Sequence, residues 1–86
     1  MFRIVVHKKV KKELKNLQKA HLKKFAEALE VLKLNPVPWK KFDIKKIEGE
    51  ENSYRIRIGD FRVIYFIDKE NKTIHILKLE RRGKVY

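Results

Sequence analysis

The fold is decided by the stretch YRIRIGDFRVIY, residues 54–65. Its first half alternates strictly between apolar and basic residues, which is the pattern of a β-strand with one buried face. The dipeptide Gly59-Asp60 separates this run from a second one, and a two-residue connection of that composition is typical of a tight hairpin with a primed turn. The stretch therefore predicts two antiparallel strands joined at Gly59-Asp60.

The arginines of this hairpin are expected to gather on one face. A two-residue turn sets Arg57 opposite Arg62, with Arg55 one pleat away. Like charges directly opposite one another destabilise a sheet, so such a cluster indicates a bound anion. Arginine holds phosphate bidentately, and Ile64 and Phe66 on the side of Arg62 place the cluster at the rim of a cleft. We interpret this face as a phosphate site; the alternative is a solvated face whose arginines meet acids elsewhere.

The composition favours a polyanionic partner. The 86 residues include 23 Lys and Arg against 11 Asp and Glu, which gives a formal net charge of +12 and a sequence pI of about 10.1. Because 43% of the residues are hydrophobic, the chain is expected to fold as a single domain over residues 1–86. The absence of Cys excludes disulfides and thiolate metal sites. Neither a transmembrane run nor a signal-peptide layout is present, so we expect a cytoplasmic protein.

The remaining elements follow from periodicity. A β-branched run at Phe2–Val6 predicts a strand, and apolar residues at helical spacing predict helices from Lys8 to Leu17 and over His21–Leu34. The helical segments are either a tight hairpin, which we favour, or one longer kinked helix. Asn35-Pro36 ends the second segment. A charged, loop-like connection follows at Trp39–Glu51, and further strands are predicted over residues 53–58, 61–67 and 73–79.

The order is therefore β-α-α-β-β-β. Helices that precede a run of hairpin-linked strands indicate an α+β fold. We expect the two N-terminal helices to pack on one face of a small antiparallel sheet and to leave part of the other face for a ligand.

The C-terminal segment contributes candidates for the same cleft. If the second hairpin has a four-residue loop at Lys69–Lys72, Leu79 pairs with Arg62 and Arg81 shares that face. A loop one residue longer or shorter selects Arg82 instead. Tyr86 offers a ring on which a base of single-stranded RNA can stack. The alternative is a basic tail that improves solubility.

Other charged and aromatic residues carry less information. Lysines in the connection before the hairpin, Lys40, Lys41, Lys45 and Lys46, are either a solvated surface or contacts to an RNA backbone. A basic amphipathic helix on a membrane surface is disfavoured because the sheet needs the apolar stripe as cover. His7, His21 and His75 lack the spacing of a metal site. Trp39, Phe42 and Ile44 are expected to close one edge of the core.

In this order and spacing, the pieces resemble the RelE branch of the RelE/ParE superfamily of toxin–antitoxin toxins. The resemblance covers nearly the whole chain: the opening strand, the basic helical pair, Asn35-Pro36, Ile47-Glu48-Gly49, the hairpin of residues 54–65 and the ending Arg82 with Val85-Tyr86. It implies a compact fold similar to the microbial ribonucleases and cleavage of mRNA in the A site of the 70S ribosome. The 2′-hydroxyl attacks the adjacent phosphate, no cofactor is used, and a RelB-type antitoxin blocks the site.

The resemblance also assigns roles to residues. Arg55 and Arg57 occupy two basic positions where family members often have lysine, one of them proposed as the general base. Arg62 matches the arginine that stabilises the charged phosphate. Arg82 matches the late arginine that supports the leaving group, so the motif favours Arg82 over Arg81. Tyr86 matches the tyrosine that stacks on the mRNA base.

One departure from the family pattern concerns the proton. Arginine is effectively never deprotonated, so Arg55 and Arg57 are poor general bases. Catalysis then rests on orientation and charge stabilisation, or another group such as Glu80 or His75 accepts the proton. Alternative functions are a ParE-type toxin that inhibits DNA gyrase and a non-catalytic basic module that binds RNA or the ribosome.

Overall fold

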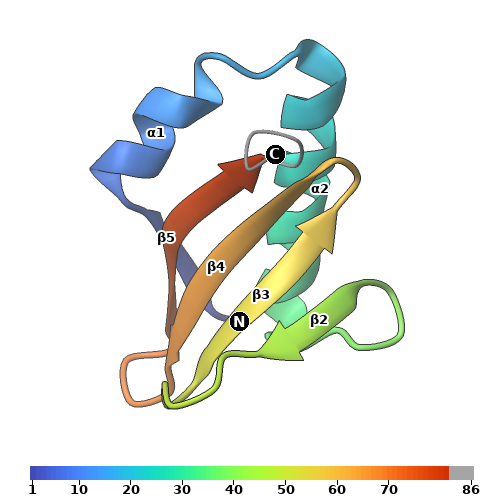
Figure 1. The fold of residues 1–86 in the computed structure, drawn as a ribbon. Coiled ribbons are helices and arrows are strands. Elements are labelled where there is room, and N and C mark those ends of the chain that lie inside the picture. Colours follow the sequence, from blue (N-terminus) through green and yellow to red (C-terminus); the bar gives the residue numbers. More distant parts are fainter. Residues whose placement is uncertain (82–86) are drawn as a thin grey trace.

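Residues 1–81 are described by the structure, a computed structural model. They form two helices and five strands (Figure 1): β1 (Arg3–Val6), α1 (Lys8–Leu14), α2 (Lys19–Leu34), β2 (Asp43–Lys46), β3 (Ser53–Ile58), β4 (Phe61–Asp68) and β5 (Thr73–Arg81). The strands lie in one sheet in the order β1-β5-β4-β3-β2. The predicted α+β class is confirmed, with the predicted elements in their predicted order.

The sheet differs from the prediction in its first and second strands. β1 pairs in parallel with β5, so the sheet is mixed, whereas β3, β4 and β5 are antiparallel as expected. The predicted loop after α2 contains the additional strand β2, in which Ile44 is buried opposite Ile56. This strand was missed because only one of its four residues is apolar, and exposed polar residues on an edge strand give little periodicity.

The two helices are separate, as the hairpin interpretation predicted. α1 ends at Leu14 and α2 begins at Lys19, and Asn35 caps α2 before Pro36. Figure 1 shows α2 crossing behind the strands. Both helices contribute to one core with the inward side of the sheet, through the buried residues Val10, Phe25, Ala28 and Leu32. The opposite side of the sheet, which we call the open face, carries no helix within residues 1–81.

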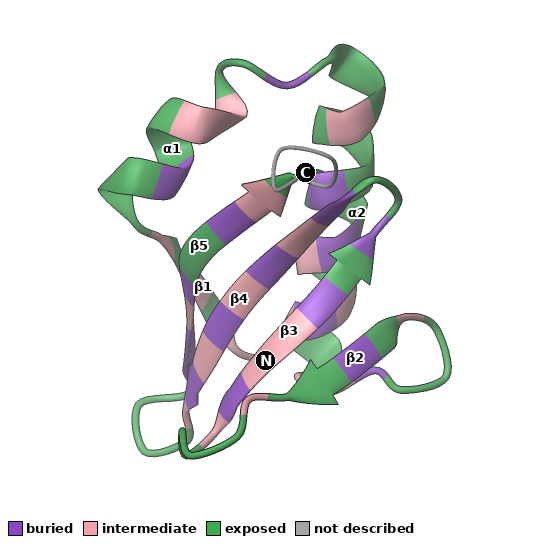
Figure 2. Ribbon diagram, viewed as in Figure 1, coloured by how far each residue is buried: buried purple, intermediate pink, exposed green. Residues whose placement is uncertain are grey.

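Alternation along the strands separates the two faces. In β4 every second residue is buried, which appears as alternating purple and pink in Figure 2. The buried set includes Val63 and Tyr65, and the open-face set includes Arg62, Ile64 and Phe66. The Tyr65 hydroxyl donates a hydrogen bond of 2.7 Å to the Pro36 carbonyl, which ties the end of α2 to the sheet. Burial, with a smaller contribution from Tyr54, raises the pKa of the Tyr65 phenol.

The first hairpin turn has the predicted two residues, and the second has four residues, one of the lengths considered from the sequence. Gly59 has a φ of +58°, a conformation that a side chain disfavours, and it places Ile58 opposite Phe61 and Arg57 opposite Arg62. The second turn joins Asp68 to Thr73 through four residues. There Asn71 donates its side-chain and backbone N–H groups to the Asp68 carboxylate, and these hydrogen bonds lower the pKa of Asp68.

A β-bulge changes the register at the far end of β5. Tyr65 pairs with Ile76 but Ile64 pairs with Lys78, so Leu77 is an extra residue. Arg62 consequently pairs with Glu80 rather than with Leu79. Arg81 pairs with Phe61 and belongs to the helix-side register, so the prediction that Arg81 shares the face of Arg62 is wrong. The loop length was correct, and the additional residue in β5 produced the error.

In the described part of the chain, neither helix combines the length and the hydropathy that a membrane crossing requires.

Candidate active site

The open face is organised in transverse rows because directly paired residues of neighbouring strands project to the same side. The row nearest the Gly59-Asp60 turn, which we call the arginine row, runs across four strands as Glu80, Arg62, Arg57 and Asp43. The next row runs as Lys78, Ile64, Arg55 and Lys45. Together the two rows hold five cationic side chains and two carboxylates. The predicted register, with Arg57 opposite Arg62 and Arg55 one pleat away on the same face, is confirmed, and the roles of these residues stay predictions.

The carboxylates of the arginine row do not neutralise its arginines by direct contact. The Glu80 carboxylate lies 3.7 Å from the Lys78 Nζ, and the ion pairs within residues 1–81 include no contact to Arg55, Arg57 or Arg62. The neighbouring Asp60 in the turn faces away, with its Oδ2 3.8 Å from His21 Nε2. The backbones of Arg57 and Arg62 lie one strand spacing apart, Arg55 lies two residues away along β3, and none of the three side chains makes an ion pair within residues 1–81.

The three arginines differ in their exposure to solvent. Arg57 is exposed, while Arg55 and Arg62 are partly buried. A partly buried guanidinium beside low-dielectric side chains such as Ile64 interacts more strongly with an anion than a fully solvated one does. This arrangement can hold a phosphate group through several charge-assisted hydrogen bonds.

The turn that brings Arg57 and Arg62 together is held against α2. A Cβ at Gly59 would lie 3.4 Å from the Lys24 Nζ, so the helix side chain covers the turn closely. The ring of His21 packs edge-on against Phe61 with centroids 5.7 Å apart. The end of the hairpin is therefore positioned by packing against α2, which limits the freedom of the arginine row.

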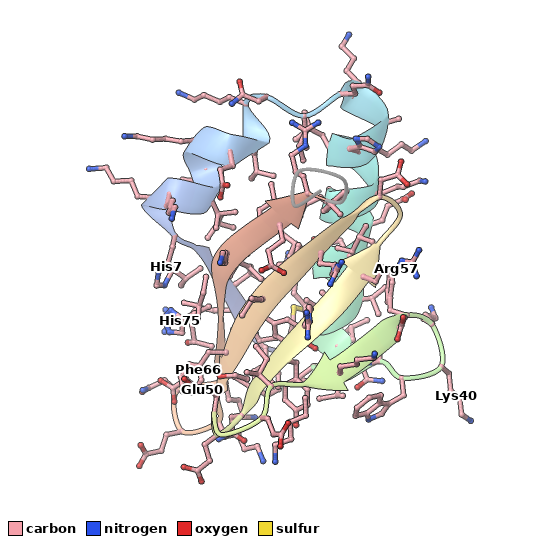
Figure 3. All side chains as sticks on the ribbon, viewed as in Figure 1. His7, Lys40, Glu50, Arg57, Phe66 and His75 are labelled. Carbon is pink, nitrogen blue, oxygen red and sulfur yellow. The ribbon has the colours of Figure 1, made fainter. Side chains whose placement is uncertain are left out.

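Of the other residues predicted to bind RNA, some lie at the arginine site and some do not. Lys45 lies beside Arg55 and joins the site, whereas Lys46 pairs with Tyr54 and belongs to the other side of β2. Lys40 and Lys41 lie in the turn before β2, and Figure 3 shows Lys40 at the edge of the molecule, away from the sheet. Arg82 and Tyr86 lie outside the described residues, so their roles stay predictions.

Sequence reasoning missed part of the arginine row. Asp43 belongs to this row and Lys45 to the next one, but the sequence predicts a loop there because the single apolar residue Ile44 gives too little periodicity to indicate a strand. The position of Glu80 beside Arg62 depends on the β-bulge in β5, and no local sequence pattern predicts that bulge. Within residues 1–81, no three His, Asp or Glu side chains are grouped in a way that could hold a metal ion.

Comparison with known proteins identifies the family. A family model described as the ParE toxin of type II toxin–antitoxin system, parDE, matches residues 4–86. The chain belongs to the RelE/ParE superfamily of toxins. Among curated relatives of this toxin family, RelE1 of Methanocaldococcus jannaschii is 47% identical over 85 residues, which cover 99% of this chain and 94% of the relative.

Solved structures support the same assignment. The archaeal RelE–RelB complex from Pyrococcus horikoshii matches with a TM-score of 0.88 and 46% identity, covering 96% of this chain and 97% of the matched chain. Isolated RelE from Escherichia coli matches with a TM-score of 0.80 over 100% of this chain and 92% of its own length, but at 17% identity it shows the fold alone. The fold of this chain is thus that of RelE toxins.

Proposed function

We propose that this chain is the toxin of a RelBE-type toxin–antitoxin pair and acts as a ribosome-dependent endoribonuclease that cleaves mRNA in the A site. The observation that carries the proposal is the arginine row with its neighbour Arg55, where three guanidinium groups face an open sheet surface and make no ion pair within residues 1–81. Such a cluster is suited to a phosphodiester whose negative charge increases during reaction. The similarity to archaeal proteins named RelE supports the toxin part of the proposal.

The proposed reaction is an internal transesterification. The ribose 2′-oxygen attacks the adjacent phosphorus, a 2′-O–P bond forms, and the P–O5′ bond breaks. The 2′-hydroxyl gives its proton to the general base, and the leaving 5′-oxygen takes a proton from water, so the products are a 2′,3′-cyclic phosphate and a 5′-hydroxyl end. Arg62 and Arg57 stabilise the charge on the nonbridging oxygens, and removal of one such oriented donor costs on the order of a hundredfold in rate. Arg82 is proposed to support the leaving oxygen and Tyr86 to orient the base.

We assign proton acceptance from the 2′-hydroxyl to Glu80. Of the two candidates, Glu80 stands directly opposite Arg62, at a typical Cβ separation of about 5 Å. His75 pairs with Phe66, four residues along β4 from Arg62, which corresponds to about 14 Å along the strand. A general base has to lie within hydrogen-bond reach of the proton it accepts, so position favours Glu80.

The chain offers a matched pair for testing this assignment. Glu80 and Asp43 are the two acids that flank the arginine row, one beside Arg62 and the other beside Arg57. Glu80→Gln is expected to lower the single-turnover cleavage rate about a hundredfold or more, while Asp43→Asn leaves it within a few-fold. Equal rates for both variants and the wild type would exclude Glu80 as the base.

The antitoxin is proposed to be a RelB-type protein with an acidic segment that covers the open face. The charge of +12 and the similarity to RelE in complex with RelB support this partner. Because both ligands are proposed to contact the arginine row, the acidic segment of the antitoxin and the mRNA compete for the same surface. A cytoplasmic location follows from these partners and belongs to the same proposal.

The test of the function is mRNA cleavage in a translation extract. Purified protein is added with and without ribosomes, and mRNA 5′ ends are mapped by primer extension. Cuts at A-site codons that require ribosomes support the proposal. Intact mRNA would contradict it, and a gyrase supercoiling assay then tests the alternative that the ParE family description favours. Intact mRNA together with unaffected gyrase would leave a non-catalytic basic module that binds RNA or the ribosome.

A further inference from the structure

The open face contains a pair of aromatic rings that the proposed reaction does not use. Phe66 and His75 are directly opposite one another on β4 and β5, and both are partly exposed. Their ring centroids are 6.2 Å apart and the ring planes differ by 35°. We call these two residues the aromatic pair. They lie on the same face as the arginines because Phe66 and Arg62 are four positions apart, an even number, on one strand.

His7 holds the His75 ring in place. The His7 Nε2 lies 3.2 Å from the His75 Nδ1, and the two rings meet edge-on with centroids 5.3 Å apart. His7 immediately follows β1, and its backbone N–H donates to the Ile76 carbonyl. Figure 3 shows the side chains of His7 and His75 next to one another on the β1–β5 side of the sheet. The His75 ring of the aromatic pair is therefore oriented by a neighbouring side chain, and the Phe66 ring packs against it.

The aromatic pair is connected to the arginine row by basic side chains. The row between them holds Arg55 and Lys78 on either side of Ile64. The distance from Arg62 to Phe66 along β4 is about 14 Å, which a short segment of single-stranded RNA can span. The nearby Asp68 carboxylate lies at the far end of the strand and accepts two hydrogen bonds from Asn71.

We propose that the aromatic pair is a stacking subsite for a base of the same single-stranded RNA whose phosphate the arginines hold. Partly exposed aromatic rings on a sheet beside cationic side chains match the way proteins bind splayed-out RNA bases. The inference rests on the proposed function for the identity of the ligand. It adds a second contact on the RNA, a few nucleotides from the reacting phosphate, and this contact binds a base without taking part in the chemistry.

The experiment measures binding of a fluorescein-labelled single-stranded oligoribonucleotide with 2′-O-methyl groups, which cannot undergo the 2′-hydroxyl attack. Fluorescence anisotropy gives the Kd for wild type, Phe66→Leu and Phe66→Tyr. Leucine keeps the apolar volume and removes the ring, so the Kd is expected to rise about tenfold. Tyrosine restores the ring and is expected to bind within about twofold of wild type.

Trp39 supplies the matched control. It is an exposed aromatic, 58% accessible, in the turn before β2 and outside the rows of the open face. Trp39→Leu is expected to leave the Kd unchanged, and circular dichroism checks that each variant is folded. Equal Kd values for wild type and Phe66→Leu overturn the subsite, as does an absence of RNA binding by the wild type.

The two proposals fail separately in the ribosome assay. Wild-type cleavage with an undiminished Phe66→Leu affinity removes the subsite and retains the nuclease. Oligoribonucleotide binding that depends on Phe66, without any mRNA cleavage, retains the subsite and removes the nuclease.

Discussion

The two faces of the sheet obey opposite rules. On the helix side, β2 to β5 bury apolar residues such as Ile56, Val63 and Ile76, which pack with α1 and α2 into one core. On the open face, Arg57 is set directly opposite Arg62, an arrangement that costs stability unless an anion is bound. Alternate residues of one strand can therefore serve folding and ligand binding separately. Substitutions on the two faces should therefore affect different measurements.

The largest change in folding free energy is expected on the helix side. Ile76→Ala removes a fully buried side chain from the centre of the core and should lower the free energy of unfolding by about 2–5 kcal/mol. Urea denaturation measures this loss. Cleavage per folded molecule should stay near that of wild type, and a specific loss of cleavage in fully folded protein would break the proposed separation of faces.

The open face should show the reverse behaviour. Arg62→Ala is expected to reduce single-turnover mRNA cleavage by a hundredfold or more, equivalent to about 3 kcal/mol in the activation barrier. Its free energy of unfolding should change by less than about 1 kcal/mol, because no ion pair to Arg62 is present within residues 1–81. Arg62→Lys should restore only part of the rate, since lysine supplies the charge without the bidentate geometry. Cleavage kinetics and thermal unfolding on the same samples check both parts.

Tyr65 tests the connection between α2 and the sheet. Tyr65→Phe removes the 2.7 Å hydrogen bond to the Pro36 carbonyl and should cost about 1 kcal/mol at pH 8. Burial raises the Tyr65 pKa in the folded state, whereas the unfolded phenol ionises near pH 10. The neutral phenol therefore contributes its full share to the free energy of unfolding below about pH 10. This share is lost as the pH rises above about 10, because the phenol then ionises in the unfolded chain but not in the folded one.

The free energy of unfolding should therefore depend on pH differently in wild type and in Tyr65→Phe. Between pH 8 and pH 11, wild type should lose more unfolding free energy than Tyr65→Phe, measured by urea denaturation at each pH. Parallel losses in both proteins would show that Tyr65 does not control this part of the stability curve.

The smallest effect is expected at a solvent-exposed ion pair. Lys33 Nζ lies 2.7 Å from the Glu30 Oε2 on the surface of α2. Lys33→Ala should change the free energy of unfolding by at most about 1 kcal/mol and leave cleavage unchanged. A large effect on either measurement would mean that this helix surface contributes more than its contacts indicate.

The parts predicted correctly from the sequence are those set by local patterns. The Gly59-Asp60 turn fixes the register of β3 and β4, and hence the Arg57–Arg62 pair, through two adjacent residues. The helix boundaries near Asn35-Pro36 likewise depend on neighbouring residues.

The parts that were missed depend on contacts between distant segments. The parallel pairing of β1 with β5 joins residues about seventy positions apart, and no local pattern encodes it. Because of the bulge at Leu77, Arg62 pairs with Glu80 instead of Leu79. Arg81 then pairs with Phe61 and does not share the face of Arg62. The sequence alone therefore suggests Glu80 as a base only because it lies near the arginines in the chain. Its place opposite Arg62 depends on the pairing of β4 with β5.

The separate roles of the helix side and the open face are tested by comparing substitutions on both in one cleavage assay. Wild type, Arg62→Ala, Ile76→Ala and Lys33→Ala are added at equal folded concentration to a translation extract containing ribosomes, and mRNA 5′ ends are mapped. The open-face proposal predicts A-site cuts with wild type, Ile76→Ala and Lys33→Ala, and none with Arg62→Ala over the same interval. Undiminished A-site cuts with Arg62→Ala would contradict it.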